Sequence, residues 1–319
     1  MADYVWHQHY GPGVPKEINP DSYPSIVAAF EESCEKYGDK VAFENMGVQM
    51  TFRELKQRSE NFAAWIQNNT SLVPGDKIAI QMPNLLQYPI CIYGSLLAGM
   101  VVVNVNPLYT SREMEHQFND SGAKAVVIVA NFCNELQECL SKTGLKHVIV
   151  TRIPDLFPQP KQFIVNLVLN HVKKMVPKFN IPNTIDFRDV VKDRGQKPKA
   201  VEIKNTDTAF LQYTGGTTGV SKGAVLTHRN VIANMEQMRG LMGDIIKEGE
   251  EIIITPLPMY HIFSLTVNCL AFICMGGKNV LITNPRDMPA FVKELQKHKW
   301  TVLTGVNTLF NGLLNNEDF

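Results

Sequence analysis

Two kinds of apolar pattern alternate along the chain. In the first, apolar residues recur every three or four positions, as they do over residues 25–37, and this spacing predicts a helix. The second is a short unbroken apolar run of strand length, as over 125–129 and 146–150. Strands without polar alternation are covered on both faces, which is typical of parallel sheets flanked by helices. The chain is therefore predicted to be α/β with largely parallel sheets.

Local capping signals predict where several helices begin. Thr51 stands three positions before Glu54, and Thr110 stands three positions before Glu113. This spacing is that of a capping box, in which the two side chains satisfy the first free backbone N–H groups of a helix. Apolar periodicity predicts further helices over 134–143 and 287–297 and a strand over 300–303.

The segment 156–182 departs from this alternation. Four lysines, Lys161, Lys173, Lys174 and Lys178, are interspersed with the apolar residues Phe163, Ile164, Leu167, Val168, Val172 and Met175. This composition predicts a basic amphipathic helix. Such a helix docks its apolar face on the protein core or lies on a membrane surface. We favour docking on the core and keep contact with a membrane as a hypothesis.

The charge balance argues against some classes of partner. The chain has 31 lysines and arginines and 31 aspartates and glutamates, so its formal net charge is zero. No overall field draws it to nucleic acid, and we expect no nucleic-acid partner. The start of the chain lacks the basic and apolar regions of a secretory signal. We expect a cytoplasmic protein.

The six cysteines carry less information than their even number suggests. None forms a C-x-x-C pair, which gives no support to a zinc ribbon or a thioredoxin-like site. An even number allows disulfides, but most of these cysteines lie in apolar runs. We therefore expect reduced, buried thiols.

The strongest chemical signal is a glycine- and threonine-rich loop at 211–223, with the sequence LQYTGGTTGVSKG. An apolar run over 208–213 predicts a strand before it, and a helix is predicted to begin near Thr227. Glycines let backbone N–H groups approach an anion, and hydroxyl and ammonium groups add further donors. These groups are Gly215, Gly216 and Gly219, then Thr214, Thr217, Thr218 and Ser221, and finally Lys222. So many donors in one loop favour a binding site for a di- or triphosphate over a flexible surface loop that binds nothing.

Two common phosphate-loop patterns do not fit this segment. A Walker A loop needs adjacent glycine and lysine, whereas Val220 and Ser221 separate Gly219 from Lys222. The G-x-G-x-x-G pattern of dinucleotide-binding proteins is also absent. The loop must therefore be a phosphate site of another kind.

The loop resembles the phosphate loop of adenylate-forming enzymes, which include acyl-CoA synthetases, adenylation domains of peptide synthetases and luciferases. Other segments are similar to the same family. These are 256–268, which contains a P-x-x-H motif, together with 104–113, 82–89, 283–287 and 304–310. The resemblance spans essentially the whole chain and is greatest to the bacterial long-chain fatty-acid–CoA ligases, in their N-terminal portion.

This resemblance implies an activity in two steps. A fatty-acid carboxylate attacks ATP to give acyl-AMP and pyrophosphate, and the thiol of coenzyme A then displaces AMP. The expected partners are thus a long-chain fatty acid, ATP, Mg²⁺ and coenzyme A. A homodimer and a peripheral contact with the inner face of the membrane are kept open.

The resemblance also assigns roles to residues. It implies that ATP contacts Tyr213, Thr214, Gly215, Gly216, Thr217, Thr218, Gly219, Val220, Ser221, Lys222, Gly223 and Ala224, and that Thr214 is a ligand of Mg²⁺. It makes His261 the candidate catalytic residue, beside the fatty-acid carboxylate. From the residues alone, a histidine in such an apolar stretch is often a hydrogen-bonded core residue. We expect no general-base role, because the carboxylate is already ionised at neutral pH.

The resemblance implies two stacked, mostly parallel α/β lobes. One lobe would span 74–240 and carry the phosphate loop. The other would combine 19–73 with 241–319, and 1–18 would be an N-terminal extension. The family's barrel, its mobile C-terminal domain and its contacts to adenine and ribose lie downstream. We therefore expect a truncated N-terminal portion that is not catalytically competent alone.

Two other functions stay open from the sequence. One is an adenylating ligase for a different carboxylic acid, although Ile262, Phe263 and Leu265 argue weakly against a small polar acid. The other is a non-catalytic module that binds an acyl group or a nucleotide.

Overall fold

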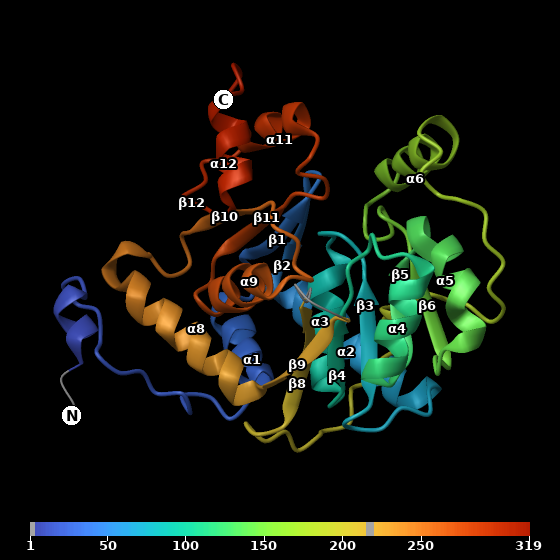
Figure 1. Cartoon of the computed structure of the whole chain (residues 1–319), viewed down its shortest axis with the longest axis horizontal. Helices are drawn as coiled ribbons and strands as arrows, with labels where there is room; N and C mark the ends of the chain where they lie inside the picture. The colour runs from blue at the N-terminus through green and yellow to red at the C-terminus, as the bar shows by residue number, and fades with distance from the viewer. Residues whose placement is uncertain (1–3, 215–219) are drawn as a thin grey trace.

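The strands of the protein form two separate open sheets (Figure 1). The computed structural model describes residues 4–214 and 220–319. The larger sheet contains β3 (Lys77–Gln81), β4 (Val101–Asn104), β5 (Ala123–Val129), β6 (His147–Thr151), β7 (Ile185–Asp186), β8 (Thr208–Thr214) and β9 (Lys222–Thr227). The smaller sheet contains β1 (Val41–Asn45), β2 (Val48–Thr51), β10 (Ile252–Thr255), β11 (Lys278–Leu281) and β12 (Val302–Leu303).

Both sheets are parallel except at one edge. The larger sheet has the order β7-β6-β5-β3-β4-β8-β9, and only β9 runs antiparallel to its neighbour. The smaller has the order β12-β10-β11-β1-β2, with β2 as its antiparallel edge. The predicted α/β fold with mostly parallel sheets is confirmed, and the described strands close into no barrel.

Helices cover both faces of each sheet. The α-helices are α1 (Ile26–Tyr37), α2 (Phe52–Asn69), α3 (Gln87–Leu97), α4 (Ser111–Ser121), α5 (Cys133–Cys139), α6 (Lys161–Leu167), α7 (Phe187–Val190), α8 (His228–Met242), α9 (Ile262–Ser264), α10 (Phe272–Cys274), α11 (Met288–Leu295) and α12 (Asn307–Leu314). Short 3-10 turns are η1 (Val5–His9), η2 (Ala130–Phe132), η3 (Leu140–Lys142) and η5 (Gly243–Ile245), and two π-helical turns are η4 (Val168–Val172) and η6 (Leu265–Ala271).

Alternate residues of one strand show why the apolar runs lack polar positions. In β5, Val127 belongs to a central core that also contains residues of α1, α2, α3 and η6. Its neighbours Val126 and Ile128 pack instead with α4 and α5 on the other face. In the smaller sheet, Ile253 faces the central core while Ile254 packs with α11 and α12. The two sheets are thus stacked on one shared layer of helices.

Helix α3 is the centre of that shared layer. The ring of Tyr93 stacks on Phe30 of α1 at 3.8 Å between centroids, and its hydroxyl donates to the backbone oxygen of Cys269 at 2.8 Å. A Cβ added to Gly94 would lie 2.7 Å from the ring of Phe62 in α2. This close approach between α2 and α3 explains why the helix contains a glycine there.

The capping predictions are confirmed. Thr51 and Glu54 form a complete capping box at α2, and Thr110 and Glu113 form one at α4. A third, which pairs Thr227 with Asn230, begins α8. All six cysteines are free, and five of them are buried. This confirms the expected thiols.

Two predictions about elements are corrected. The segment 156–182 is not one helix, because α6 and η4 end by Val172 and the rest is irregular. Its apolar residues are only partly docked: Val165 and Leu169 pack against the core, whereas Phe163 is 65% exposed. The second correction is β9, an edge strand between the glycine-rich loop and α8 that we did not predict.

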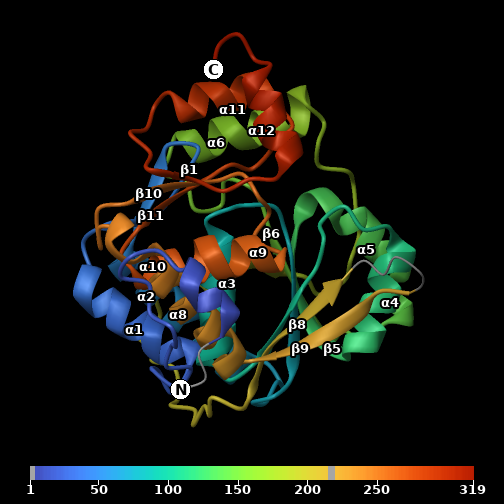
Figure 2. The same cartoon turned by 60° about the vertical axis from the view of Figure 1, so that its left-hand side comes forward.

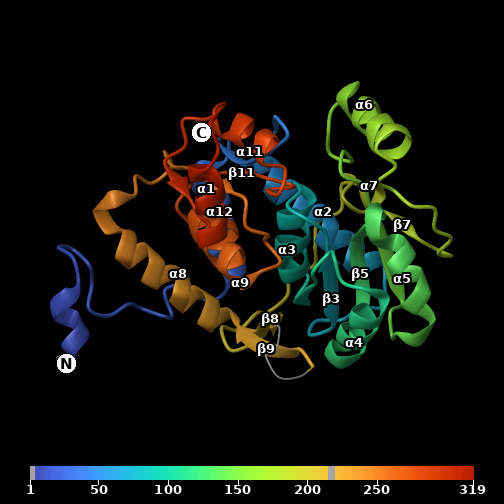
Figure 3. The ribbon, with the colours of Figure 1, turned by 45° about the horizontal axis from the view of Figure 1, so that its top comes forward.

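The N-terminal segment lies along α8 (Figure 3). A Cβ on Gly240 would meet the side chain of Pro15 at 2.8 Å, so the two segments touch. No helix in the described part of the chain is both long and apolar enough to cross a membrane. The lobe boundaries at 19–73 plus 241–319 and 74–240 stay a prediction.

Candidate functional site

A cleft of about 820 Å³ opens where the parallel strands β4 and β8 end. Its lining comes from β4 and the loop after it, α4, β8, the two residues before β9, and the segment after β10. It consists of Asn104, Asn106, Tyr109, Arg112, Glu113, His116, Gln212, Tyr213, Val220, Ser221, Tyr260 and His261. The carboxyl ends of parallel strands are where α/β sheets place their ligands. The cleft also brings together the two most distinctive sequence segments, the glycine-rich loop and the P-x-x-H motif.

A chain of side-chain hydrogen bonds forms the floor of the cleft. The hydroxyl of Tyr88 in α3 donates to Oδ1 of Asn104 at 2.6 Å, and Nδ2 of Asn104 donates to Oε1 of Gln212 at 3.0 Å. Nε2 of Gln212 then donates to the backbone oxygen of Tyr260 at 2.9 Å. Asn104 and Gln212 are buried. A satisfied buried network of this kind holds its members in one arrangement, so both walls of the cleft are fixed to the central core.

Strands β8 and β9 pair as an antiparallel hairpin (Figure 2), and the predicted phosphate loop lies between them in the sequence. Thr214 and Lys222 are direct partners in the antiparallel ladder, and both are exposed. The predicted ligands Gly215, Gly216, Thr217, Thr218 and Gly219 lie outside the described residues. The hydroxyl of Thr214 and the ammonium of Lys222 therefore stand at the two ends of that loop.

The predicted site residues divide into three groups in space. Tyr213, Val220, Ser221 and His261 line the cleft. Thr214 and Lys222 occupy the open end of the hairpin and are not among the lining residues. Gly223 and Ala224 continue β9 away from the loop.

Gly223 has a packing reason to lack a side chain. A Cβ at this position would lie 2.9 Å from the ring of Tyr213, its partner across the ladder. The Tyr213 hydroxyl in turn donates to a carboxylate oxygen of Asp120 in α4. This contact ties the hairpin to the helix beside it.

Helix α4 contributes two basic residues that sequence reasoning did not single out. Nε2 of His116 lies 3.2 Å from the backbone oxygen of Ser221, which fixes the start of β9 against the helix. Arg112 lines the cleft, is exposed, and makes no ion pair with any described residue. The first turn of a helix also carries partial positive charge. The available signal was the 104–113 motif, in which Arg112 directly precedes the capping glutamate.

Glu113 is the one carboxylate among the lining residues of the cleft, and it is already engaged. Its side chain accepts hydrogen bonds from the backbone N–H and the hydroxyl of Thr110, both at 2.8 Å. The cleft therefore presents mainly N–H, hydroxyl and cationic groups, which suits an anionic ligand.

His261 caps α9 and leaves one ring nitrogen for other partners. Its Nδ1 accepts from the backbone N–H of Phe263 at 3.4 Å. In the neutral tautomer that this bond selects, the proton is on Nε2. The side chain is exposed and lines the cleft, so it is not a core histidine. It can donate a hydrogen bond to an oxygen bound there.

Tyrosines in the cleft remain neutral donors. Burial raises the pKa of Tyr260 and Tyr109, and Glu113 raises that of Tyr109 further. Burial and the hydrogen bond to Asp120 raise the pKa of Tyr213. These phenols therefore bring no negative charge that would repel a phosphate or a carboxylate.

Asn84 fastens the segment after β10 to the loop before α3. Its Nδ2 donates to the backbone oxygens of Thr255 and Leu257, both at 2.9 Å, and its Oδ1 accepts from the N–H of Met259 at 2.8 Å. The side chain is buried. Asn84 lies in segment 82–89, one of the segments that resemble the family. Its single amide satisfies three backbone groups between the sheets, which gives this resemblance a structural reason.

Comparisons with known proteins place the chain in a family. The profile of a family described as AMP-binding enzyme matches residues 30–319. A long-chain-fatty-acid–CoA ligase of Escherichia coli O6:H1 is 54% identical over 317 residues, which cover 99% of this chain and 56% of that protein. The corresponding ligase of Bacillus subtilis (strain 168) is 30% identical, with coverage of 98% and 55%. The chain spans about half the length of the curated relatives it matches.

Solved structures show the same fold. A long-chain-fatty-acid–CoA ligase from Archaeoglobus fulgidus superposes with a TM-score of 0.77 at 24% identity, and the match covers 96% of this chain and 56% of that one. An anthranilate CoA ligase in complex with anthranoyl-AMP gives a TM-score of 0.79 at 17% identity, with coverage of 95% and 54%. The family profile includes both walls of the cleft, and the chain belongs to the AMP-binding enzyme family.

Proposed function

We propose that the protein containing this chain is a long-chain fatty-acid–CoA ligase. A carboxylate oxygen of the fatty acid attacks the α-phosphorus of ATP, and the bond to the β-phosphate breaks to release pyrophosphate. The sulfur of coenzyme A then attacks the acyl carbon of the acyl-AMP. The bond to AMP breaks, and the thiol proton passes to solvent.

One observation carries this proposal above the others. Residues that flank the glycine-rich loop, Tyr213, Val220 and Ser221, line the same cleft as His261, whose ring can donate a hydrogen bond. This cleft occurs in a chain 54% identical to proteins named long-chain-fatty-acid–CoA ligases. The reaction needs two anions, a triphosphate and a carboxylate, brought side by side. Catalysis of phosphoryl and nucleotidyl chemistry rests largely on positioning and on stabilising charge, and this cleft supplies donors for both.

The residues receive the following roles in the proposal. The loop 214–219, with Val220, Ser221, Gly223 and Ala224 around it, would cradle the phosphates with backbone N–H and hydroxyl groups. Lys222 and Arg112 would add positive charge at either side. Tyr213 would form the wall next to the nucleotide. His261 would hold the fatty-acid carboxylate through its Nε2–H.

The fit of Mg²⁺ to the described residues is limited. Mg²⁺ prefers oxygen ligands and usually keeps several waters beside substrate phosphates. Glu113 is occupied in a capping box, which leaves the exposed hydroxyl of Thr214 as the predicted protein oxygen at the loop. We therefore propose that Mg²⁺ arrives with ATP, is held chiefly by the phosphates, and contacts Thr214.

A pyrophosphate-exchange assay on the intact protein tests the proposed function. Labelled pyrophosphate should enter ATP only when a fatty acid is present, and long-chain acids should give the fastest exchange. Exchange that is fastest with acetate or an aryl acid would instead identify a ligase for that acid. Binding of ATP or fatty acid without any exchange would identify the non-catalytic module. Loss of free coenzyme A thiol in the presence of ATP and acid completes the test.

We further propose that the exposed surface of 163–178 meets a membrane. Phe163, Ile164, Leu167, Val172 and Met175 are each at least 45% exposed. Lys173, Lys174 and Lys178 are exposed beside them. Apolar side chains can enter the headgroup region while each lysine contributes about 1 kcal/mol near an anionic surface. A long-chain substrate concentrates in bilayers, so this contact would bring the enzyme to its fatty acid.

Vesicle co-sedimentation tests the membrane contact. The protein should bind anionic vesicles in low salt, and the triple substitution of Lys173, Lys174 and Lys178 by glutamine should abolish binding. The matched control replaces the exposed Lys192, Lys197 and Lys199 with glutamine and should bind like the wild type. Equal binding by both triple variants would rule this surface out as the contact.

A further inference from the structure

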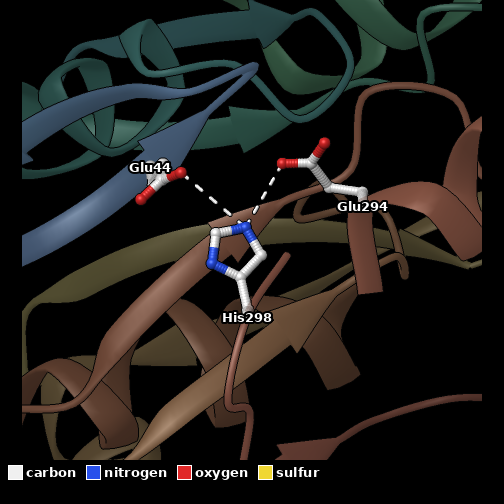
Figure 4. A group of neighbouring side chains, drawn as sticks. All are labelled: Glu44, Glu294 and His298. Atoms are coloured by element: carbon white, nitrogen blue, oxygen red, sulfur yellow. Dashed lines mark hydrogen bonds and ion pairs between the residues drawn. The ribbon is translucent and has the colours of Figure 1, made fainter. Parts of the chain in front are cut away.

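Three potential metal ligands meet far from the cleft, on the smaller sheet. Glu44 lies on β1, Glu294 lies near the end of α11, and His298 follows that helix. Figure 4 shows the imidazole of His298 directed at both carboxylates. The three side chains are mostly enclosed, with exposed fractions of 7%, 16% and 9%. We propose that they form a binding site for one divalent transition-metal ion of the Zn²⁺ type.

The distances fit a tetrahedral ion. Nε2 of His298 lies 3.3 Å from Oε1 of Glu294 and 3.7 Å from Oε1 of Glu44. Zinc bonds of about 2.0–2.2 Å imply ligand-to-ligand separations of about 3.3–3.6 Å in a tetrahedron. The ligand atoms all lie within 4.8 Å of one another. Small side-chain movements would therefore close the site around an ion.

Hydrogen bonding alone satisfies this cluster poorly. The 3.7 Å separation between His298 and Glu44 is too long for a hydrogen bond, and the single ring nitrogen Nε2 faces both carboxylates. A metal ion would engage the imidazole nitrogen and both Oε1 atoms at once. One nitrogen and two oxygens suit Zn²⁺ and its first-row neighbours better than Mg²⁺ or Ca²⁺, which require more oxygen ligands.

The remaining carboxylate oxygens are already held in place. Oε2 of Glu44 accepts from Nζ of Lys278 at 2.6 Å and from Nε2 of Gln49 at 2.8 Å. Oε2 of Glu294 accepts from Nζ of Lys297 at 2.6 Å. These contacts engage Oε2 of each glutamate and leave Oε1 facing His298. The same two ammonium groups repel a divalent cation, so we expect a moderate affinity.

Solvent reaches the edge of the site, and a bound ion would stabilise the smaller sheet. Glu294 and Lys297 line a cleft of about 470 Å³, so solvent reaches one of the three ligands. An ion bound there would connect β1 to the end of α11, two elements separated by roughly 250 positions, and would stabilise the folded arrangement of the smaller sheet.

Metal titration of matched variants tests the proposal. Zn²⁺ binding is followed by calorimetry and by thermal unfolding, and Co²⁺ binding by the visible absorption of a tetrahedral ion, all in excess Mg²⁺. Wild type should bind one ion at this site and melt at a higher temperature with Zn²⁺. Glu294→Gln and His298→Gln should weaken binding by about tenfold or more and lose the thermal shift. His171→Gln, which alters an exposed histidine on η4, serves as the control and should behave like the wild type.

A fourth variant separates an ion site from an ion-pair cluster. Lys297→Gln removes an exposed ammonium that competes for Glu294, so it should bind Zn²⁺ more tightly than the wild type. If Glu294→Gln and His298→Gln bind Zn²⁺ as wild type does, or if wild type shows no saturable binding, the three residues are only an ion-pair cluster and the proposal is wrong. Glu294→Gln keeps a side chain of the same shape at a partly exposed position, so this variant keeps the test valid if His298→Gln fails to fold.

Discussion

The two walls of the cleft are built in opposite ways. One wall is the hairpin of β8 and β9, where Lys222, Ala224 and Val225 are exposed on the edge strand of the larger sheet. The other is the segment 256–268, which buried amides hold from both sides. Asn84 bonds to three backbone groups in or next to this segment. Nδ2 of Asn268 donates to the hydroxyls of Thr255 and Thr304 at 2.9 Å each.

Because of this difference, we expect the hairpin to serve ligand binding and the segment 256–268 to serve folding stability. A side chain that contacts solvent in the absence of ligand contributes little to folding, whereas a buried amide whose loss leaves backbone groups unpaired contributes much. Substitutions in the hairpin should therefore change ligand binding, and substitutions around 256–268 should change the free energy of unfolding. Single substitutions in each wall test this division.

Asn84→Ala should give the largest loss of stability. It leaves two backbone oxygens and one N–H without their partner in a buried position, at about 1–3 kcal/mol for each unsatisfied group. We expect the free energy of unfolding to fall by about 3 kcal/mol or more, measured by urea denaturation. Asn234→Ala on the exposed face of α8 is the control and should change it by less than about 0.5 kcal/mol. Equal effects of the two substitutions would contradict the fastening role of Asn84.

His228 should make the base of the hairpin sensitive to acid. It is buried after β9, where its Nδ1 accepts from the N–H of Ile26 at 3.2 Å, and burial lowers its pKa to about 4. Below the ordinary histidine pKa of about 6.5, the unfolded chain binds a proton that the folded chain excludes. Stability should therefore fall by about 3 kcal/mol as the pH drops from 6.5 to 4.

A glutamine substitution isolates this effect from other titrating groups. The side chain introduced by His228→Gln is uncharged, and its amide oxygen can accept the same hydrogen bond. The variant should therefore lose stability less steeply over that pH range. The comparison requires urea denaturation at several pH values. Parallel pH profiles for both proteins would show that the proton affinity of His228 does not differ between the folded and unfolded states.

Lys222→Ala should impair the use of ATP without unfolding the protein. The loss of one charge-assisted contact costs about 1.5–3 kcal/mol, which is roughly a 10- to 150-fold fall in adenylation efficiency. Because Lys222 is exposed, the melting temperature of the variant should stay near that of the wild type. Lys204→Ala, at an exposed lysine before β8, should leave both quantities unchanged. A large drop in melting temperature with normal pyrophosphate exchange would show that Lys222 supports folding and not the use of ATP.

His261 combines both roles on a smaller scale. His261→Ala should lose about 0.5–2 kcal/mol of stability with the N-cap, and should also slow adenylation. His261→Asn should restore the cap, because asparagine is a good N-cap residue, but should leave adenylation slow. If the asparagine variant recovers full activity, the ring Nε2–H has no part in holding the carboxylate.

Local signals in the sequence predicted more of this fold than of its site. The capping boxes at Thr51 and Thr110 depend on residues three positions apart, so a short stretch of sequence contains the whole interaction. The unbroken apolar runs likewise predicted strands covered on both faces. The strand β9 was missed because Lys222–Thr227 lies at a sheet edge and is largely accessible to solvent, which leaves no apolar run to detect.

The parts of the site that were missed depend on distant partners. Asn84 acts on backbone groups about 170 positions away, and no local pattern specifies such a contact. Arg112 becomes a candidate site residue only in the folded structure, where α4 and β8 line the same cleft. The glycine-rich loop was identified because it concentrates its donors in one short segment, and the roles of Thr214, Lys222 and His261 stay predictions.

The pairing of β1 with β11 has a consequence for synthesis of the chain. Asn45 donates its side-chain amide to the backbone oxygen of Leu281, a residue 236 positions later. At about 5–20 residues per second, the ribosome needs roughly 10–50 seconds to make the intervening chain. During that interval the larger sheet can assemble, while β1 and β2 wait with an unpaired edge. Until the later strands emerge, this edge of β1 is therefore open to pairing with other chains.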